Sequence, residues 1–328
     1  YMNGNCSEAV SELTKYLEKY PNGTFTLNAH FYKADCELKA GFENEALMDF
    51  NYVLEQPKSK FTETALVKAA EINMTLGKSE EALNNYNKLE YLADIPANVF
   101  KAQVAQMRLN FQLNNIEATI KYCEIIINKD ADDANLITEA HLLYGKVAMA
   151  QDDYNLALTE FATAASSANE FGAEGKYNVA HIIHMRGEYD NCESEVFSLI
   201  KKFPSYGYWI GKSLVLLADN YTAKEDLFQA KVTLNNVIDN SKFPELVSTA
   251  TEKLEKIEAQ EAAMRVPEKE IEIDVELFDD AEFQKLFSED EEVVEEELPI
   301  IEDTKIENEI VPDDDDEKEE IEETPEDE

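Results

Sequence analysis

One feature restricts the fold of this 328-residue chain more than any other: a small side chain recurs every 35–39 residues. A larger apolar residue follows each one four positions later, and a glycine stands five positions before four of the seven. Residues four apart lie on one helical face, and a period in the thirties is typical of helical repeats. The seven small residues are Ala9, Ala46, Ala82, Ala118, Ala157, Cys192 and Ala230.

The stretch 140–165 shows why each unit should be a pair of helices. Its first apolar series, which includes Leu143 and Val147, follows the three- and four-residue spacing of a helix until Asp152. A second series begins at Tyr154. We therefore expect an antiparallel helical hairpin, in which the small residue Gly145 lets the two backbones approach closely.

The unit resembles the tetratricopeptide repeat over residues 1–240. The resemblance rests on the small residue of the first helix, the aromatics of both helices and the proline after the second helix. These positions are occupied by Gly145, Ala180 and Ala218; by Tyr221, Tyr154 and Tyr189; and by Pro21 and Pro204. It implies an all-α, right-handed superhelix of stacked antiparallel helix pairs, an α-solenoid.

Two units depart from the repeat pattern. Gln106 stands where the Ala118 unit should have a small residue, and no glycine precedes Ala230. We expect less regular geometry in both.

The domain boundaries follow from the repeat. Residues 1–23 are predicted to be the second helix of a truncated repeat, 24–244 six repeats, 245–265 a capping helix and 266–328 an acidic tail. The capping helix should turn its apolar residues inward, among them Leu246 and Ile257. Because the chain begins with Tyr1 in the middle of a unit, we expect it to be part of a longer array.

The charge is unevenly distributed. The net charge is −41, and residues 266–328 contain 31 acidic and 4 basic side chains, a composition typical of disorder. Such acidity excludes nucleic acid as a partner, because like charge repels phosphate, and favours basic protein surfaces. No run approaches the roughly 18 apolar residues that cross a bilayer. The oligomeric state stays open.

No motif predicts catalysis or a cofactor. The segment 207–213 is one residue short of a phosphate-binding loop and follows no strand, so we expect it to lie inside a helix. His181 and His184 share a helical face but have no third ligand nearby, and we expect no metal site there. Cys6 and Cys36 lie on helices that should be neighbours. They could form a disulfide bond, but we favour unpaired buried thiols.

The first helices of the repeats should line a groove that binds a protein or peptide partner. Its predicted residues are Phe31, Asp35, Val67, Glu71, Met74, Leu142, Lys146, Met149, Tyr177, His181, His184, Lys212, Val215 and Asp219. A second predicted element lies in the tail, where four apolar residues share a helical face. They are Leu277, Phe283, Leu286 and Phe287, and they are interpreted as a recognition element that docks into this groove or a partner's.

We interpret the chain as a non-catalytic scaffold. Its segment 208–239 is similar to the last repeat of large envelope tetratricopeptide proteins of Bacteroidota, which implies a periplasmic or cell-envelope assembly; the cytoplasm is the alternative. Two other functions stay open. One is a chaperone-like or regulatory adaptor whose acidic tail is autoinhibitory. The other is the repeat part of a larger enzyme whose catalytic domain lies outside this sequence.

Overall fold

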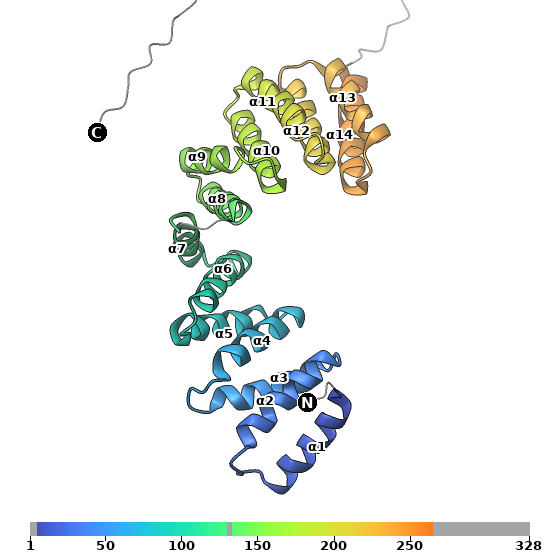
Figure 1. Ribbon diagram of the computed structural model, residues 1–328. Coiled ribbons are helices and arrows are strands. Elements are labelled where there is room, and N and C mark those ends of the chain that lie inside the picture. Colours follow the sequence, from blue (N-terminus) through green and yellow to red (C-terminus); the bar gives the residue numbers. More distant parts are fainter. Residues whose placement is uncertain (1–4, 130–132, 265–328) are drawn as a thin grey trace, which may run out of the picture. The chain divides into compact units, whose positions relative to one another are not determined.

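A computed structural model describes residues 5–129 and 133–264, which form fourteen α-helices and no strand (Figure 1). The helices are α1 (Cys6–Lys19), α2 (Thr26–Lys39), α3 (Glu43–Glu55), α4 (Thr62–Thr75), α5 (Ser79–Leu92), α6 (Pro96–Gln112), α7 (Ile116–Ile127), α8 (Ala134–Ala150), α9 (Tyr154–Ala164), α10 (Glu170–Met185), α11 (Tyr189–Lys202), α12 (Gly207–Ala223), α13 (Leu227–Asn240) and α14 (Pro244–Met264). No helix within these two ranges is both long and apolar enough to cross a membrane. The all-α fold class is confirmed.

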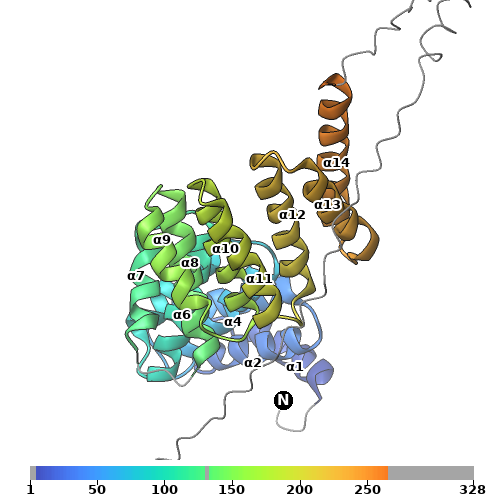
Figure 2. The ribbon, with the colours of Figure 1, turned by 90° about the horizontal axis from the view of Figure 1, so that it is seen from above.

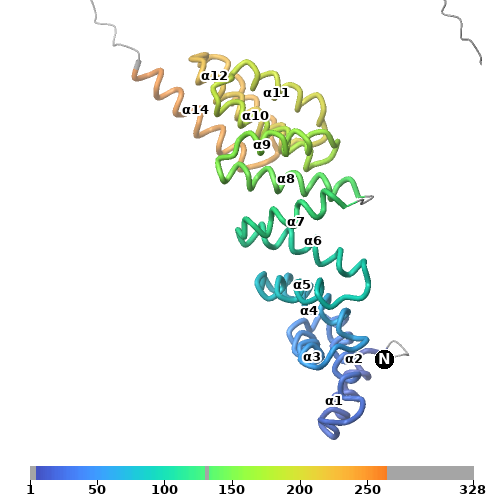
Figure 3. The backbone as a smooth tube through the Cα atoms, turned by 90° about the vertical axis from the view of Figure 1, so that its left-hand side faces the viewer, coloured from blue at the N-terminus to red at the C-terminus, as the bar shows by residue number. Residues whose placement is uncertain are grey.

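Each helix packs against the helices before and after it in the chain (Figures 1 and 3). Six repeats are formed by the pairs α2–α3, α4–α5, α6–α7, α8–α9, α10–α11 and α12–α13. First helices of successive repeats also contact each other, as α8 and α10 do (Figure 2). The last helix, α14, covers α13 and α12 with the buried side chains of Leu246, Ala250 and Ile257. The array is therefore a tetratricopeptide-like solenoid.

The six repeats share one turn between their helices. In each, one residue has positive φ: Gly41, Gly77, Asn114, Asp152, Gly187 or Glu225. The next residue donates its N–H to a carbonyl five positions back, as from Lys78 to Asn73 (2.8 Å) and from Asp226 to Tyr221 (2.9 Å). This bond satisfies a carbonyl at the helix end. The expectation of a less regular turn before Ala230 is wrong, because Glu225 adopts the left-handed conformation with φ of 62°.

Counting from this turn gives the contact between the two helices of a repeat. The fifth residue after the turn residue is small or short and fully buried in all six repeats. The ninth is the larger partner, as Phe161 is in α9. In α8 the opposing position is Gly145, where an added Cβ would lie 2.6 Å from the Phe161 ring. A glycine is required there because the ring occupies the space of a side chain.

The α6–α7 repeat corrects the sequence register by one residue. Counted from Asn114, the small position is Thr119 and the large position is Cys123, both fully buried, whereas Ala118 is only half-buried. The opposing α6 residue is Met107, also fully buried, and not Gln106. Ala118 fits the sequence spacing, but the turn and the packing show that Thr119 occupies the small position.

A disulfide joins Cys6 of α1 to Cys36 of α2, whose Cα atoms lie 5.0 Å apart. The preference for unpaired thiols is therefore wrong at this pair, because α1 packs directly beside α2 and brings the two residues together. Cys123 and Cys192 are buried and free.

Candidate functional site

The first helices of the repeats present a row of ionisable residues, which we call the first-helix face. It is defined by Glu71, Lys101, Arg108, Glu139, Lys146, Glu174, His181, Lys212 and Asp219. Five of these nine were predicted as groove residues. The others follow only from the corrected register of α6–α7 or from positions that the projection omitted.

Ion pairs join one repeat to the next along this face. Each pair joins the first helices of two successive repeats. One partner directly follows the position that opposes the second helix, as Lys146 follows Gly145. The other partner lies six residues before the equivalent position of the next repeat, as Glu174 lies before Ala180. These pairs are Glu71–Lys101 (2.5 Å), Arg108–Glu139 (2.6 Å) and Lys146–Glu174 (2.6 Å). Asp219 makes a corresponding pair with Lys253 of α14 (2.6 Å). Opposite charges separated by 28–34 residues were the sequence signal that would have found them.

Hydrogen bonds from basic side chains stabilise the ionised form of Glu71 and orient the carboxylate of Glu139. Burial opposes ionisation of Glu71, yet the ammonium groups of Lys101 and Lys68 outweigh it and hold the pKa of Glu71 below its usual value. Arg108 donates two hydrogen bonds to Glu139, from Nε (2.7 Å) and from Nη2 (2.6 Å). Such a fork fixes direction as well as distance, so the pairs hold adjacent repeats in register.

Several predicted groove residues contribute to the core. Leu142 is 1% exposed, and Val67 and Val215 are also buried. Phe31 stacks on Phe61 with ring centroids 4.4 Å apart and packs against the core around Phe50. For Leu142 the assignment as a contact residue is corrected, because repeat-to-repeat packing already covers its side chain.

The remaining predicted residues stay at least partly accessible. Met74 is exposed and accepts a weak hydrogen bond from the Tyr86 hydroxyl (3.8 Å to sulfur), while Met149 is half-buried. Asp35 pairs with Lys39 (2.6 Å). His184 contacts the Asn220 side-chain oxygen through Nδ1 (3.2 Å). Among the described residues no group of three His, Cys, Asp or Glu side chains is arranged to hold a metal ion.

Five predicted groove residues converge on one cavity of about 320 Å³, which we call the α12 cleft. They are Tyr177 and His181 of α10 and Lys212, Val215 and Asp219 of α12. Buried Leu216 and Leu246 line it as well, together with the Tyr208 ring. Helix α14 contributes the remaining wall, including Glu245 and Lys253. The cleft combines an apolar lining with charged residues, as binding sites do.

The row of ion pairs is interrupted at this cleft. By register, His181 should pair with Lys212, but both are basic. The Lys212 ammonium instead lies over two rings, 4.8 Å from the centroid of Tyr177 and 5.0 Å from that of Trp209. Burial and the Lys146 charge lower the pKa of Lys212, while Glu174 opposes them. Burial, His184 and Lys212 lower the pKa of His181. The Lys212 ammonium therefore contacts aromatic rings where the other junctions have a carboxylate.

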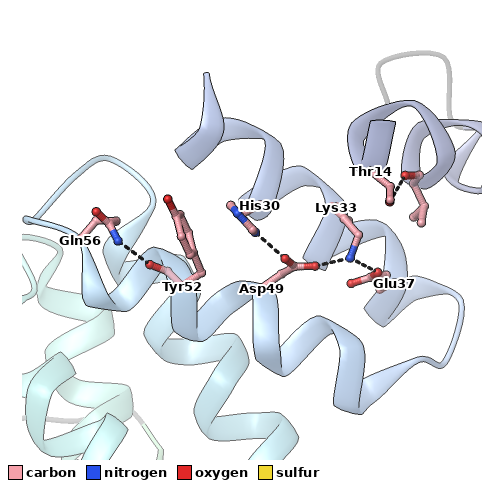
Figure 4. Close-up of polar contacts among 8 residues, drawn as sticks. Thr14, His30, Lys33, Glu37, Asp49, Tyr52 and Gln56 are labelled. Atoms are coloured by element: carbon pink, nitrogen blue, oxygen red, sulfur yellow. Dashed lines mark hydrogen bonds and ion pairs between the residues drawn. The ribbon is translucent and has the colours of Figure 1, made fainter. Parts of the chain in front are cut away.

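A second charged cluster lies between α2 and α3 (Figure 4). Asp49 contacts His30 Nδ1 (2.5 Å) and Lys33 Nζ (2.5 Å), and Lys33 also pairs with Glu37 (2.5 Å). Burial raises the pKa of the Glu37 carboxyl. In two other repeats the same register joins His141 to Glu160 and Lys176 to Glu195. These contacts bind the two helices of one repeat together.

Two further sequence predictions complete the account. Residues 207–213 begin α12 and are helical, so they do not form a phosphate-binding loop. The predicted recognition element with Leu277, Phe283, Leu286 and Phe287 lies outside the described residues.

Comparisons with known proteins agree with this fold. The C-terminal part of a tetratricopeptide repeat-containing protein from Cytophaga hutchinsonii superposes with a TM-score of 0.54 at 16% identity, over 76% of this chain and 95% of that one. A tetratricopeptide repeat protein from Parabacteroides merdae aligns over 76% of this chain and 93% of its own, at 17% identity and a TM-score of 0.42. No family model and no curated protein matches the sequence. The fold is that of the tetratricopeptide repeat proteins.

Proposed function

We propose that this chain, with its tetratricopeptide fold, is a non-catalytic scaffold that binds a peptide or protein segment along the first-helix face. The observation that carries the proposal is the convergence of five first-helix residues on the α12 cleft. Solenoids use such repeated faces for binding, because adjacent repeats offer equivalent positions to one extended partner. The charged cluster of Figure 4 has a structural explanation within one repeat, which leaves the cleft as the favoured site.

Site-specific photocrosslinking tests this proposal in the native cells with the full chain. A photoreactive phenylalanine analogue replaces Tyr177 in the cleft, Met74 on the first-helix side or, as control, the exposed Phe197 of α11. We expect the same protein partners to be captured from Tyr177 and Met74 and not from Phe197. Capture from Phe197 alone, or equally from all three positions, would place the binding surface elsewhere and contradict the proposal.

The compartment that we propose is the cell envelope, as part of a larger assembly. The Cys6–Cys36 disulfide supports it, because structural disulfides persist in oxidising compartments and are rare in the cytosol. Rapid alkylation of intact cells followed by mass spectrometry measures the state of these cysteines. A bonded pair is expected, with Cys123 and Cys192 found as thiols after unfolding. Alkylated Cys6 and Cys36 would instead indicate the cytoplasm.

A further inference from the structure

We propose that the α12 cleft binds an acidic side chain within a partner segment, next to an apolar residue of the same segment. This inference rests on the proposed function and names the chemistry of its ligand. The whole chain, with a net charge of −41, favours basic partners on average. Within the cleft, however, the Lys212 ammonium has no carboxylate partner among the described residues.

The first step of the argument is the interrupted row of ion pairs. At three successive junctions a cation of the first-helix face is neutralised by a carboxylate within 2.6 Å. Asp219 of this face is likewise paired with Lys253 of α14 at 2.6 Å. At the α10–α12 junction a histidine and a lysine occupy the two positions. No ion pair links Lys212 to a carboxylate of residues 5–129 or 133–264. One anion is therefore missing from the pattern at this point.

The second step concerns the nearby acids, each of which is held by another lysine or exposed to water. Glu174 is held by Lys146 and Asp219 is held by Lys253, each at 2.6 Å. Glu245 lines the cleft from α14 but is exposed, where water screens its charge. An incoming carboxylate would thus meet Lys212 without displacing an existing ion pair. It would also gain from His181, which becomes a donor at both ring nitrogens when protonated.

The third step is the apolar part of the lining. Buried Val215, Leu216 and Leu246 line the same cleft as Lys212, and the Lys212 ammonium lies over the rings of Tyr177 and Trp209. This surface keeps water away from one side of the ammonium, which strengthens a charged contact. It also offers area to an apolar neighbour of the acid. The volume of about 320 Å³ accommodates a few side chains, not a folded domain.

The test is a selection from a random dodecapeptide library on the full chain. Each peptide is fused to its carrier through its C-terminus, so that no terminal carboxylate is present. We expect Asp or Glu beside an apolar residue to be enriched on the wild-type chain. The enrichment should persist with Lys212→Arg, which keeps the charge. It should be lost with Lys212→Met. The control Lys201→Met removes an equal charge from the exposed surface of α11.

Binding of the best selected peptide, acetylated and amidated at its ends, is then measured by fluorescence anisotropy. Replacing its acid by the matching amide should weaken binding to the wild-type chain about tenfold, as loss of a charged hydrogen bond does. With Lys212→Met the same change should have an effect of about twofold or less. Selected peptides without acids, or an acid effect unchanged by Lys212→Met, would overturn this inference alone. Failure to select any peptide would contradict the proposed function as well.

Discussion

The α8–α9 and α6–α7 repeats end their first helices in the same turn but fill the contact between their helices in opposite ways. In α8–α9 the first helix contributes Gly145 and the second contributes the bulky Phe161. In α6–α7 the first helix contributes Met107 and the second contributes Cys123. The comparison teaches that the fold conserves the filled volume between two helices and not the identity of either residue.

A further difference accompanies this exchange. Glu90 of α5 accepts hydrogen bonds from Gln106 (2.7 Å), Gln103 (3.1 Å) and the Tyr122 hydroxyl (2.8 Å), and so ties α5 to both helices of the α6–α7 repeat. Gln106 is fully buried, and Glu90 accepts the hydrogen bond from its Nε2 group. The α8–α9 repeat has no glutamine at the corresponding positions, which are occupied by His141 and Tyr144. The repeat that departs from the pattern is thus held to α5 by the hydrogen bonds of Glu90, which we call the polar anchor.

The largest effect should come from deleting the bulky partner on the second helix. Phe161→Ala should lower the free energy of unfolding by about 3–5 kcal/mol, because it leaves a cavity at a fully buried site. The equivalent Cys123→Ala removes only one sulfur atom and should cost about 1 kcal/mol. Urea unfolding followed by circular dichroism measures both. Similar losses in the two variants would refute the exchange of roles between the repeats.

The next effect tests the exchange from the first helix. Met107→Ala should cost about 2–4 kcal/mol. Adding Cys123→Phe to it recreates the size distribution of α8–α9 and should recover at least half of the loss. Cys123→Phe alone should destabilise by overpacking against Met107, by about 1–3 kcal/mol. Additive losses in the double variant would show that the two residues do not share one space.

A smaller effect concerns the polar anchor. Burial opposes ionisation of Glu90, but the hydrogen bonds from Gln106, Gln103 and Tyr122 prevail and hold its pKa below the usual value. A lowered folded-state pKa gives stability that is present above the unfolded pKa, about 4.3, and is lost as pH falls through the folded pKa. The unfolding free energy of Glu90→Gln should therefore fall less than that of wild type between pH 5 and pH 3. Glu81→Gln, on the exposed side of α5, should follow the wild-type profile.

The smallest effect compares the turns themselves. Glu225→Gly should stabilise the chain by about 0.5–1 kcal/mol, because a left-handed conformation strains an ordinary side chain. Asn114→Gly should change stability by less than about 0.5 kcal/mol, since asparagine tolerates φ of 58°. The midpoint temperatures of thermal unfolding of the two variants, each compared with wild type, measure these changes. A stabilisation of the same size at both positions would mean that side-chain identity does not matter in this turn.

Much of the fold was accessible from the sequence. The helix pairs around Gly145 and Phe161, the closing helix with Leu246 and Ile257, and the helical nature of 207–213 follow from local spacing. The α6–α7 register was not accessible, because Ala118 satisfies the spacing rule as well as Thr119 does. Part of the candidate site was also predicted, since Tyr177, His181 and Lys212 do meet in one cleft. The ion pairs were missed because their partners lie about 30 residues apart.

The sequence by itself determined that this chain forms repeated helical hairpins. Periodic apolar positions and backbone conformational preferences are local, and they act before any long-range contact exists. Only the tertiary structure decided that Met107 opposes Cys123, that Cys6 reaches Cys36 and that Lys212 lies over the Tyr177 ring. Each of these depends on which side chains from different helices share the same space, and close packing selects one arrangement among several that the pattern allows.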